Sequence, residues 1–309
     1  MAAVVTPVDQ RPTSDPPQRK RTPLWRSKGA MVAYVFILPY VLFFAVFRIA
    51  PAIYGTVLSF GDFSLSGAFT LEGLDNYRRL FADSLFWNAL RVTGIYAAIA
   101  IPVTVAISLA MAQLCNRVLR GMSFFRSIYF LPVVTSPVLA GIVFIWIFSA
   151  DGPLNSGLSI FGLELGSWLQ SSVLVLPALA LVSAWLNFGY NMLILLAGML
   201  AIPVDYYEAA ELDGASTWQR FRKITLPLLK PALFFVLILE TVKSFQAFDT
   251  IYVMTGGGPV RASYTLTYMI FDQGFGYFDF GYASATGVVL LIITLIFSLI
   301  QRRILGRDN

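Results

Sequence analysis

Long apolar runs separated by short polar segments fill most of the chain. Windows of about 20 apolar residues, the length that crosses a bilayer as α-helix, lie near residues 30–50, 90–115, 126–149, 172–200, 226–248 and 282–301. Because every backbone polar group must be satisfied inside a bilayer, helices are the expected form of such runs. The pattern therefore predicts an all-α polytopic membrane protein with six transmembrane helices.

The segments outside these runs have their own patterns. Residues 1–28 are polar and rich in proline, so they cannot bury enough apolar surface to offset their ordering entropy, and we expect a disordered tail before a six-helix domain at 29–309. After the first span, "LDNYRRLFADSLFWNAL" repeats apolar residues at helical spacing, which predicts an amphipathic helix lying on the outer surface. Prolines within the spans, such as Pro132 and Pro137, indicate kinks.

The distribution of basic residues indicates an orientation. The chain has 309 residues, of which 57% are hydrophobic and 13% charged. Lys and Arg gather before the first span, at 117–126, at 220–223 and at 302–307, all on one side if the spans alternate, whereas 150–171 contains neither. The positive-inside rule then places both termini in the cytoplasm of a multi-pass cell-membrane protein. The net charge of +5 reflects this topology, and nucleic-acid binding is not expected.

The residue inventory excludes several kinds of chemistry. The chain contains no histidine and one cysteine, Cys115, which we interpret as a small apolar filler at a helix end. The acidic residues lack metal-ligand spacing, and no G-x-x-x-x-G-K-[ST] sequence is present to cradle a phosphate. We therefore expect a non-catalytic chain with no catalytic residue, no metal site and no cofactor of its own.

A charged segment, "EAAELDGASTWQRFRKITLP", follows the fourth apolar run and leads into the fifth. Asp205 and Glu208 have the spacing of a capping box at a helix start, and Gly214 can adopt the left-handed conformation that ends a helix. Ser216 followed by Gln219 offers a second capping box. The loop at 203–226 is thus predicted to be two short helices joined at Asp213–Gly214, which we call the elbow.

The side chains of this loop are either small or acidic. The small ones at 209, 210, 214 and 215 allow another protein to approach the backbone closely, and Glu208 and Asp213 supply charge for a basic partner or for holding the elbow. Residue chemistry leaves two interpretations open, a solvated pair of interfacial helices and a docking site for a partner protein.

Polar side chains within the fourth and fifth runs are candidates for a solute pathway. Asn187 and Asn191 lie one turn apart with Tyr190 between them, and the fifth run places Glu240, Lys243, Ser244 and Ala247 on one helical face. A charge near mid-membrane costs about 2.5–3.5 kcal/mol on insertion scales, so this face is expected to look into a polar interior. Two alternatives remain: Asn187 and Asn191 only make hydrogen bonds to neighbouring helices, and Glu240 and Lys243 form a self-neutralising pair near the outer gate.

The charged loop resembles the EAA loop of the membrane subunits of binding-protein-dependent ABC importers, because it contains Glu208-Ala209-Ala210, Asp213-Gly214-Ala215 and Leu226-Pro227. Further stretches resemble the carbohydrate-importer branch in the same order. They are "GLDNYRRLF" at 73–81, "RSIYFLPVV" at 126–134, "AGMLAIPVDYYEAA" at 197–210, "FDTIYVMTGGGP" at 248–259 and "GYASA" at 281–285. "MTGGGP" is similar to the first of the two paired permeases, the class related to the maltose and glycerol-3-phosphate importers.

The resemblance implies an assembly. The loop residues Glu208, Ala209, Ala210, Asp213, Gly214 and Ala215 would seat in a cleft on a separate ATPase, which carries ATP and Mg. The implied partners are a second homologous permease, two ATP-binding cassette subunits, an extracytoplasmic solute-binding (lipo)protein, membrane lipid and the sugar itself.

The resemblance also implies a solute pathway. Sugar contacts of the maltose relative match Leu186, Asn187, Tyr190, Glu240, Lys243, Ser244 and Ala247, although this chain differs in carrying charges at Glu240 and Lys243. The proline-rich basic tail is similar to that of actinobacterial trehalose importers, so a disaccharide such as trehalose is the expected solute.

Two rival classes fit the residues less well. A secondary transporter or channel subunit working without an ATPase can also place a site at mid-membrane, but it gives no reason for a short helix-elbow-helix loop. An intramembrane enzyme needs paired catalytic groups, and among the intramembrane acids only Glu240 stands out.

Overall fold

The computed structural model describes residues 28–63, 69–116, 121–163 and 165–305, and the chain forms two compact units, Met1–Ile53 and Tyr54–Asn309. In the first unit, α1 (Lys28–Phe44) continues through a π-helical turn, η2 (Ala45–Ile49), into α2 (Ala50–Leu58), whose last five residues belong to the second unit. None of the side chains in the apolar window of this span is buried. The tail expected at 1–28 lies, apart from Lys28, outside the described residues.

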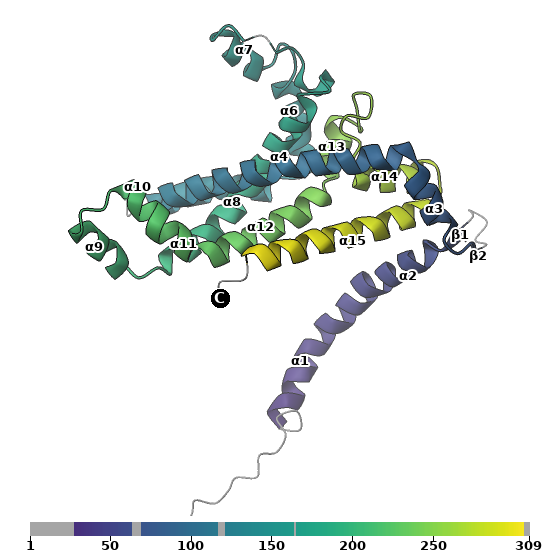
Figure 1. The fold of residues 1–309 in the computed structure, drawn as a ribbon, viewed down its shortest axis with the longest axis horizontal. Helices are drawn as coiled ribbons and strands as arrows, with labels where there is room; N and C mark the ends of the chain where they lie inside the picture. The colour runs from purple at the N-terminus through teal and green to yellow at the C-terminus, as the bar shows by residue number, and fades with distance from the viewer. Residues whose placement is uncertain (1–27, 64–68, 117–120, 164, 306–309) are drawn as a thin grey trace, which may run out of the picture. The chain divides into compact units, whose positions relative to one another are not determined.

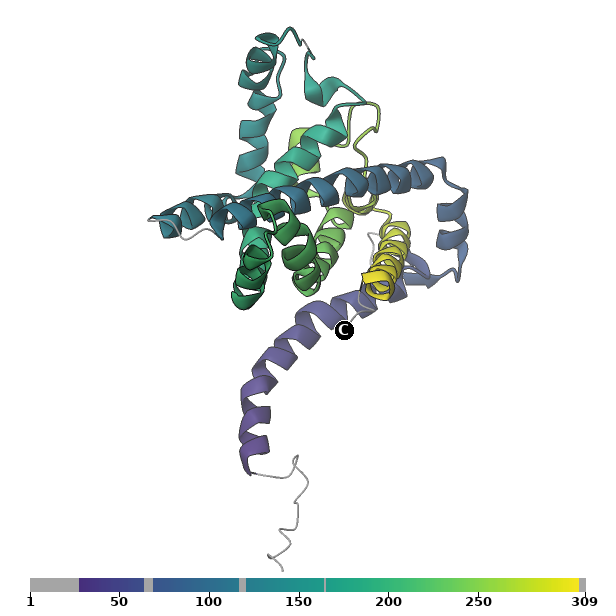
Figure 2. The same cartoon turned by 60° about the vertical axis from the view of Figure 1, so that its left-hand side comes forward.

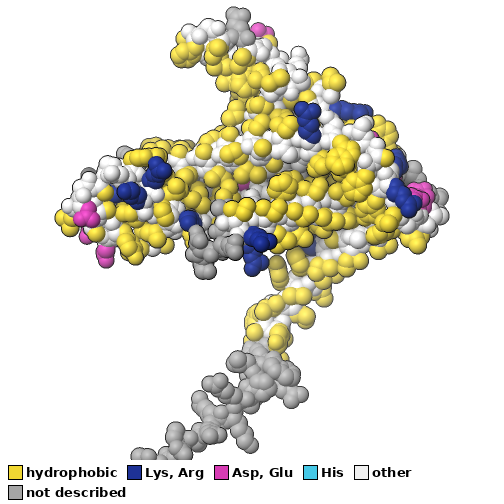
Figure 3. Space-filling model, viewed as in Figure 1, with side chains coloured by type: hydrophobic (Ala, Val, Ile, Leu, Met, Phe, Trp, Pro, Cys, Tyr) yellow, Lys and Arg dark blue, Asp and Glu magenta, His cyan; other side chains and the backbone are white. Residues whose placement is uncertain are grey.

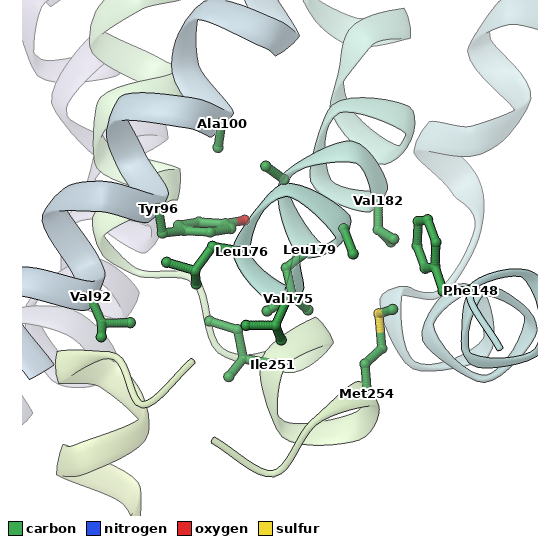
Figure 4. Close-up of a cluster of buried hydrophobic side chains, with 12 residues drawn as sticks. Val92, Tyr96, Ala100, Phe148, Val175, Leu176, Leu179, Val182, Ile251 and Met254 are labelled. Carbon is green, nitrogen blue, oxygen red and sulfur yellow. The ribbon is translucent and has the colours of Figure 1, made fainter. Parts of the chain in front are cut away.

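The second unit is built on α4 (Ser84–Cys115) and α8 (Val175–Leu200), which pack along each other (Figure 1). α12 (Lys230–Phe245) contacts α4 and α8, and α15 (Phe280–Leu305) contacts α12. Small side chains allow this packing, because Ala100 of α4 and Ala178 of α8 are both buried in one core cluster. One core cluster joins α4, α8 and α13 (Asp249–Met254), as Figure 4 shows.

Two of the predicted spans are bent at prolines. α5 (Met122–Phe130) and η3 (Leu131–Val134) turn by 96° into α6 (Pro137–Ile147), since Pro137 holds the preceding Ser136 in an extended conformation with ψ 129°. The helical segments α10 (Thr217–Arg220), η5 (Phe221–Thr225) and α11 (Leu226–Leu228) turn by 69° into α12. Among the described residues, four helices are long and apolar enough to cross a membrane, or six if each bent pair is one span.

The segment after the first apolar run differs from its prediction in two ways. It contains a two-stranded antiparallel sheet of β1 (Gly61–Phe63) and β2 (Phe69–Leu71), so the chain is mainly rather than entirely helical. The expected amphipathic helix exists as α3 (Asp75–Ala82), but its Leu80 is fully buried in a core cluster with Tyr282. α3 therefore packs on α15 through this face instead of lying free on a surface.

Charged side chains fix this end of the second unit. Arg79 pairs with Asp279 at 2.6 Å, and its guanidinium lies 4.4 Å from the centre of the Tyr282 ring. The Tyr282 hydroxyl donates to Asp83 at 2.7 Å, and Asp83 caps the start of α4. These contacts join α3, α4 and α15 at one end of the bundle.

The remaining short elements connect the long helices. α7 (Pro153–Ser159) and η4 (Trp168–Gln170) lie between α6 and α8, and the α6–α7 segment projects away from the α4–α8 pair in Figures 1 and 2. α9 (Asp205–Leu212) precedes α10, and α14 (Leu266–Phe271) and η6 (Asp272–Gly276) follow α13. On the face drawn in Figure 3, the middle of the second unit is mainly apolar, and charged side chains gather towards α9–α10 and towards α3.

Candidate functional site

The elbow is a left-handed turn closed by two backbone hydrogen bonds. Gly214 has φ +75°, its N–H donates to the Glu211 carbonyl at 3.0 Å, and the N–H of Ala215 donates to the Ala210 carbonyl at 2.9 Å. This pair of bonds is the Schellman motif that ends an α-helix at glycine. The prediction that Gly214 ends the first helix is therefore confirmed.

Of the two predicted capping boxes, one is present. The N–H of Gln219 donates to Ser216 Oγ at 3.3 Å, and the N–H of Ser216 donates to Gln219 Oε1 at 2.7 Å. The box predicted at Asp205 and Glu208 is wrong, because α9 begins at Asp205 itself and Val204 precedes it without a side-chain cap. Both acids instead lie in the first turn of α9, where the helix dipole favours negative charge.

Side-chain contacts hold the two short helices together across the elbow. Arg220 Nη1 lies 2.6 Å from Glu211 Oε2, and the hydroxyls of Tyr207 and Thr225 are 2.9 Å apart. A hollow of about 340 Å³ opens beside the turn, lined by Ala210, Asp213, Gly214, Ala215, Gln219, Arg220, Lys223 and Ile224. Four of the six predicted coupling residues line this hollow.

The other two coupling residues, Glu208 and Ala209, are exposed on α9 outside the hollow. Large apolar side chains of the loop are also exposed, most of all Leu212 by 90% and Trp218 by 67%. The sequence reasoning did not single out Leu212, although an apolar residue between Glu211 and Asp213 in a charged loop is a signal of contact with a partner. Exposed apolar side chains within a charged element are typical of an interaction surface.

A cavity of about 600 Å³ lies where α8, α12 and the bent α5–α6 segment meet. Its lining residues are Tyr96, Val133, Thr135, Pro137, Ser183, Leu186, Asn187, Tyr190, Leu239, Lys243, Gln246, Ala247, Phe248, Asp249 and Thr250. Five of the eight predicted pathway residues therefore reach the cavity: Leu186, Asn187, Tyr190, Lys243 and Ala247. Asn191, Glu240 and Ser244 are buried and do not line it, because α12 packs on α8 at their level.

A network of polar side chains crosses from α8 to α12, partly on the cavity wall and partly behind it. Asn191 Nδ2 donates to Glu240 Oε1 at 2.8 Å, and Lys243 Nζ donates to Asn187 Oδ1 at 2.8 Å. Lys243 Nζ is also 3.6 Å from Glu240 Oε1. Both alternatives considered for these residues, interhelical hydrogen bonds and a Glu–Lys pair, are thus present together.

The two charges of this network differ in exposure. The Glu240 side chain is 1% exposed and the Lys243 side chain 41%, so the ammonium faces the cavity and the carboxylate lies behind it. A buried carboxylate is tolerated only when it is paired and hydrogen-bonded, and Glu240 is both. Lys243 also lies 5.3 Å from the centre of the Tyr190 ring, a cation–π distance.

Several lining residues were not predicted from the sequence. Gln246 and Thr250 follow Lys243 at i+3 and i+7, so the helical period gave a signal for them. Ser183 likewise precedes Asn187 by four residues on α8. Tyr96 and Phe248 gave no such signal, because they reach the cavity through the packing of separate elements. Together the lining offers aromatic faces and hydrogen-bonding groups within one space, which suits a polyhydroxylated solute.

In the described ranges, Cys115 and the acidic side chains do not add a further site. Cys115 is buried at the end of α4, with its sulfur 3.8 Å from that of Met192. Within the described part of the chain, no group of three or more His, Cys, Asp or Glu side chains is arranged to hold a metal ion.

Comparison with known proteins gives consistent matches. Residues 103–307 match the family described as binding-protein-dependent transport system inner membrane component. A probable ABC transporter permease, YesP of Bacillus subtilis, is 36% identical, with 88% of this chain and 90% of the relative covered. The trehalose/maltose transport system permease MalF of Thermococcus litoralis is 32% identical, with 90% and 94% covered.

A solved structure shares the fold. A chain of a bacterial alginate ABC transporter, crystallised in complex with an alginate pentasaccharide-bound periplasmic protein, superposes with a TM-score of 0.77 at 22% identity. The match covers 91% of this chain and 96% of the other.

Proposed function

Because the chain belongs to the family of binding-protein-dependent transport system inner membrane components, we propose that it is a permease subunit of an ATP-driven sugar importer. It forms half of the translocation pathway for a disaccharide of the trehalose type and has no catalytic role of its own. The relative from Thermococcus litoralis, which is named for trehalose and maltose transport, supports this class of solute.

The cavity is the observation that carries the proposal. Its wall combines the aromatic rings of Tyr190 and Phe248 with the amides of Asn187 and Gln246, which is the pairing that a sugar ring requires. The local charges are one ammonium, Lys243, against two carboxylates, Glu240 behind it and Asp249 on the wall. This balance favours a neutral sugar over an anionic solute such as a phosphate ester.

The geometry supports a division of roles among the pathway residues. Leu186, Asn187, Tyr190, Lys243 and Ala247 contact the solute, because they line the cavity. Asn191, Glu240 and Ser244 position them from behind. Glu240 in particular fixes the Lys243 ammonium beside Asn187, so it acts as a positioning residue rather than a solute contact.

The elbow is the proposed contact with the ATP-binding subunit. The hollow beside Gly214 receives a side chain of that subunit, while Glu208, Ala209 and the exposed Leu212 contact its surface. The helical path from α10 through α12 leads from the elbow to Lys243. The closed ATP-binding subunits then bind one position of the elbow more tightly than the other. This difference in affinity sets how far ATP shifts the chain from one membrane conformation to the other.

The family supports the proposed assembly. The chain works in the cell (plasma or inner) membrane with both termini cytoplasmic, beside a second homologous permease. Two ATP-binding cassette subunits supply ATP hydrolysis, and an extracytoplasmic solute-binding lipoprotein delivers the sugar.

Uptake tests the proposal. In a strain that lacks the gene, complementation should restore uptake of labelled trehalose or maltose but not of glycerol 3-phosphate. The purified complex should contain an ATP-binding subunit. Restored sugar uptake without any such subunit would instead support a secondary transporter. Restored uptake of glycerol 3-phosphate alone would refute the assignment of a sugar as the solute.

A further inference from the structure

A row of aromatic rings starts at the cavity and continues beyond it. Phe248, which lines the cavity, lies 5.0 Å from Phe271, and Phe271 lies 5.5 Å from Phe275. Tyr252 stacks on Phe248 at 5.3 Å and meets Phe271 edge-on at 5.1 Å. We call these four rings, from α13, α14 and η6, the aromatic row.

The row ends in exposed rings, unlike the aromatic side chains of the core. Tyr252 is 48% exposed and Phe275 is 65% exposed, while Phe248 and Phe271 are partly buried. Large aromatic rings offer more apolar contact area than any other side chain. The row therefore presents ring faces that continue outward from the polar-lined cavity.

The backbone around the row is held in uncommon conformations. Phe275 lies on the π-helical turn η6, and Phe278, which follows it, has φ +59°. Such conformations persist only where surrounding contacts enforce them, and they concentrate at functional sites. At the exposed end of the row, the Phe275 ring meets Phe280 edge-on at 6.3 Å.

The position of the row indicates where in transport it acts. α12 begins beside the elbow and ends beside α13, so the row lies at the end of α12 remote from the proposed ATPase contact. Gln246 and Asp249 stand at the junction of row and cavity and offer an amide and a carboxylate to hydroxyl groups. Aromatic rings that only face lipid have no reason to continue into the polar lining of the cavity.

We propose that the aromatic row is a stacking surface that receives sugar rings on their way to the cavity. One face of a pyranose presents polarised C–H groups, which are attracted to the negative face of an aromatic ring. The row extends solute binding beyond the cavity, so a trisaccharide gains more from it than a disaccharide does. This inference rests on the proposed function and names a saccharide contact outside the cavity.

Replacement of Phe275 tests the row. In cells with the complete importer, Phe275→Ala should raise the KM for labelled maltotriose by about 3- to 10-fold, the range expected for one lost aromatic contact. The KM for trehalose should rise less. Phe275→Trp should preserve both values, because it keeps a ring face, and Phe275→Leu should behave like Phe275→Ala. Tyr277→Ala is the matched control, since Tyr277 is 68% exposed but outside the row.

Other outcomes separate the alternatives. If Phe275→Leu transports as well as the wild type, the position needs only apolar surface, as a lipid contact does, and the inference is wrong. If Phe275→Ala loses the second permease on co-purification, the row is a subunit interface and the inference is also wrong. If the wild type transports the sugars and none of the variants changes KM, only the inference fails. If the wild type transports no sugar, the proposed function and the inference fail together.

Discussion

The ammonium of Lys243 donates a hydrogen bond to Asn187 Oδ1 at 2.8 Å and thereby joins α12 to α8 at the wall of the cavity. The same ammonium lies 3.6 Å from Glu240, which in turn accepts from Asn191 at 2.8 Å. Each of the two helices thus supplies two members of one network. The network both ties the helices together and sets the polarity of the cavity.

Removing the ammonium should destabilise the protein. Lys243→Met leaves the buried Glu240 carboxylate without its charge partner, and we expect a loss of about 1–3 kcal/mol, below the cost for a fully buried pair because Lys243 is solvent-screened. The double variant Glu240→Gln/Lys243→Met removes both charges and should recover most of this stability. Thermal unfolding of the complex in detergent measures both, and equal melting of single and double variants would contradict the pairing.

The elbow should tolerate few residues at position 214. Gly214 has φ +75° with no atom within 4 Å of where a Cβ would stand, so the cost of substitution comes from the backbone angle alone. Gly214→Val is expected to cost about 1–2 kcal/mol locally and to abolish sugar-stimulated ATPase activity without preventing membrane insertion. Gly214→Asn, which adopts left-handed angles more readily, should retain part of the activity. Full activity of Gly214→Val would refute the role of the turn.

The exposed apolar side chain of the elbow offers a test of docking. Leu212→Asp should leave folding unchanged, because Leu212 is 90% exposed, but should prevent co-purification of the ATP-binding subunit. Ile160→Asp is the matched control, since Ile160 is 81% exposed and lies on the segment after α7. Loss of the subunit in both variants, or in neither, would count against a docking surface at the elbow.

The close approach of the bent third span to α8 depends on a single glycine. A Cβ at Gly189 would collide with the backbone carbonyl of Tyr129, so Gly189→Ala should cost about 1–3 kcal/mol by overpacking. Gly94→Ala on α4 meets nothing within 4 Å and should be neutral or slightly stabilising. Melting temperatures of the two variants compare the effects directly, and an unaffected Gly189→Ala would indicate that the bent span can move away.

The sequence predicted local features well and long-range packing poorly. The chemistry of Gly214, and of Ser216 with Gln219, acts within a few residues, and all three positions have the predicted conformation or contact. The cap at Asp205 was misassigned because an acid suits the first turn of a helix as well as its cap. A sequence pattern cannot distinguish these two positions without the backbone angles.

The cavity shows the same limit. Helical periodicity placed Lys243 and Ala247 on one face, and both line the cavity. Thr135 and Tyr96 line it only because the third span bends by 96° and α4 packs on α8. These are properties of several elements together, so no single stretch of sequence encodes them. Leu80 on α3 is a further example, since its burial against α15 depends on residues about 200 positions away.

α12 runs without a break from Lys230 to Lys243, after the 69° bend that separates it from α10, η5 and α11. From Lys230 to Lys243 a helix rises roughly 20 Å, so a tilt of about 5° at its first turn sweeps its far end through about 2 Å. A hydrogen bond tolerates only a few tenths of an ångström of stretch. If the elbow moves in the proposed importer, a small tilt of α12 is therefore enough to break the hydrogen bond between Lys243 and Asn187 at the cavity wall.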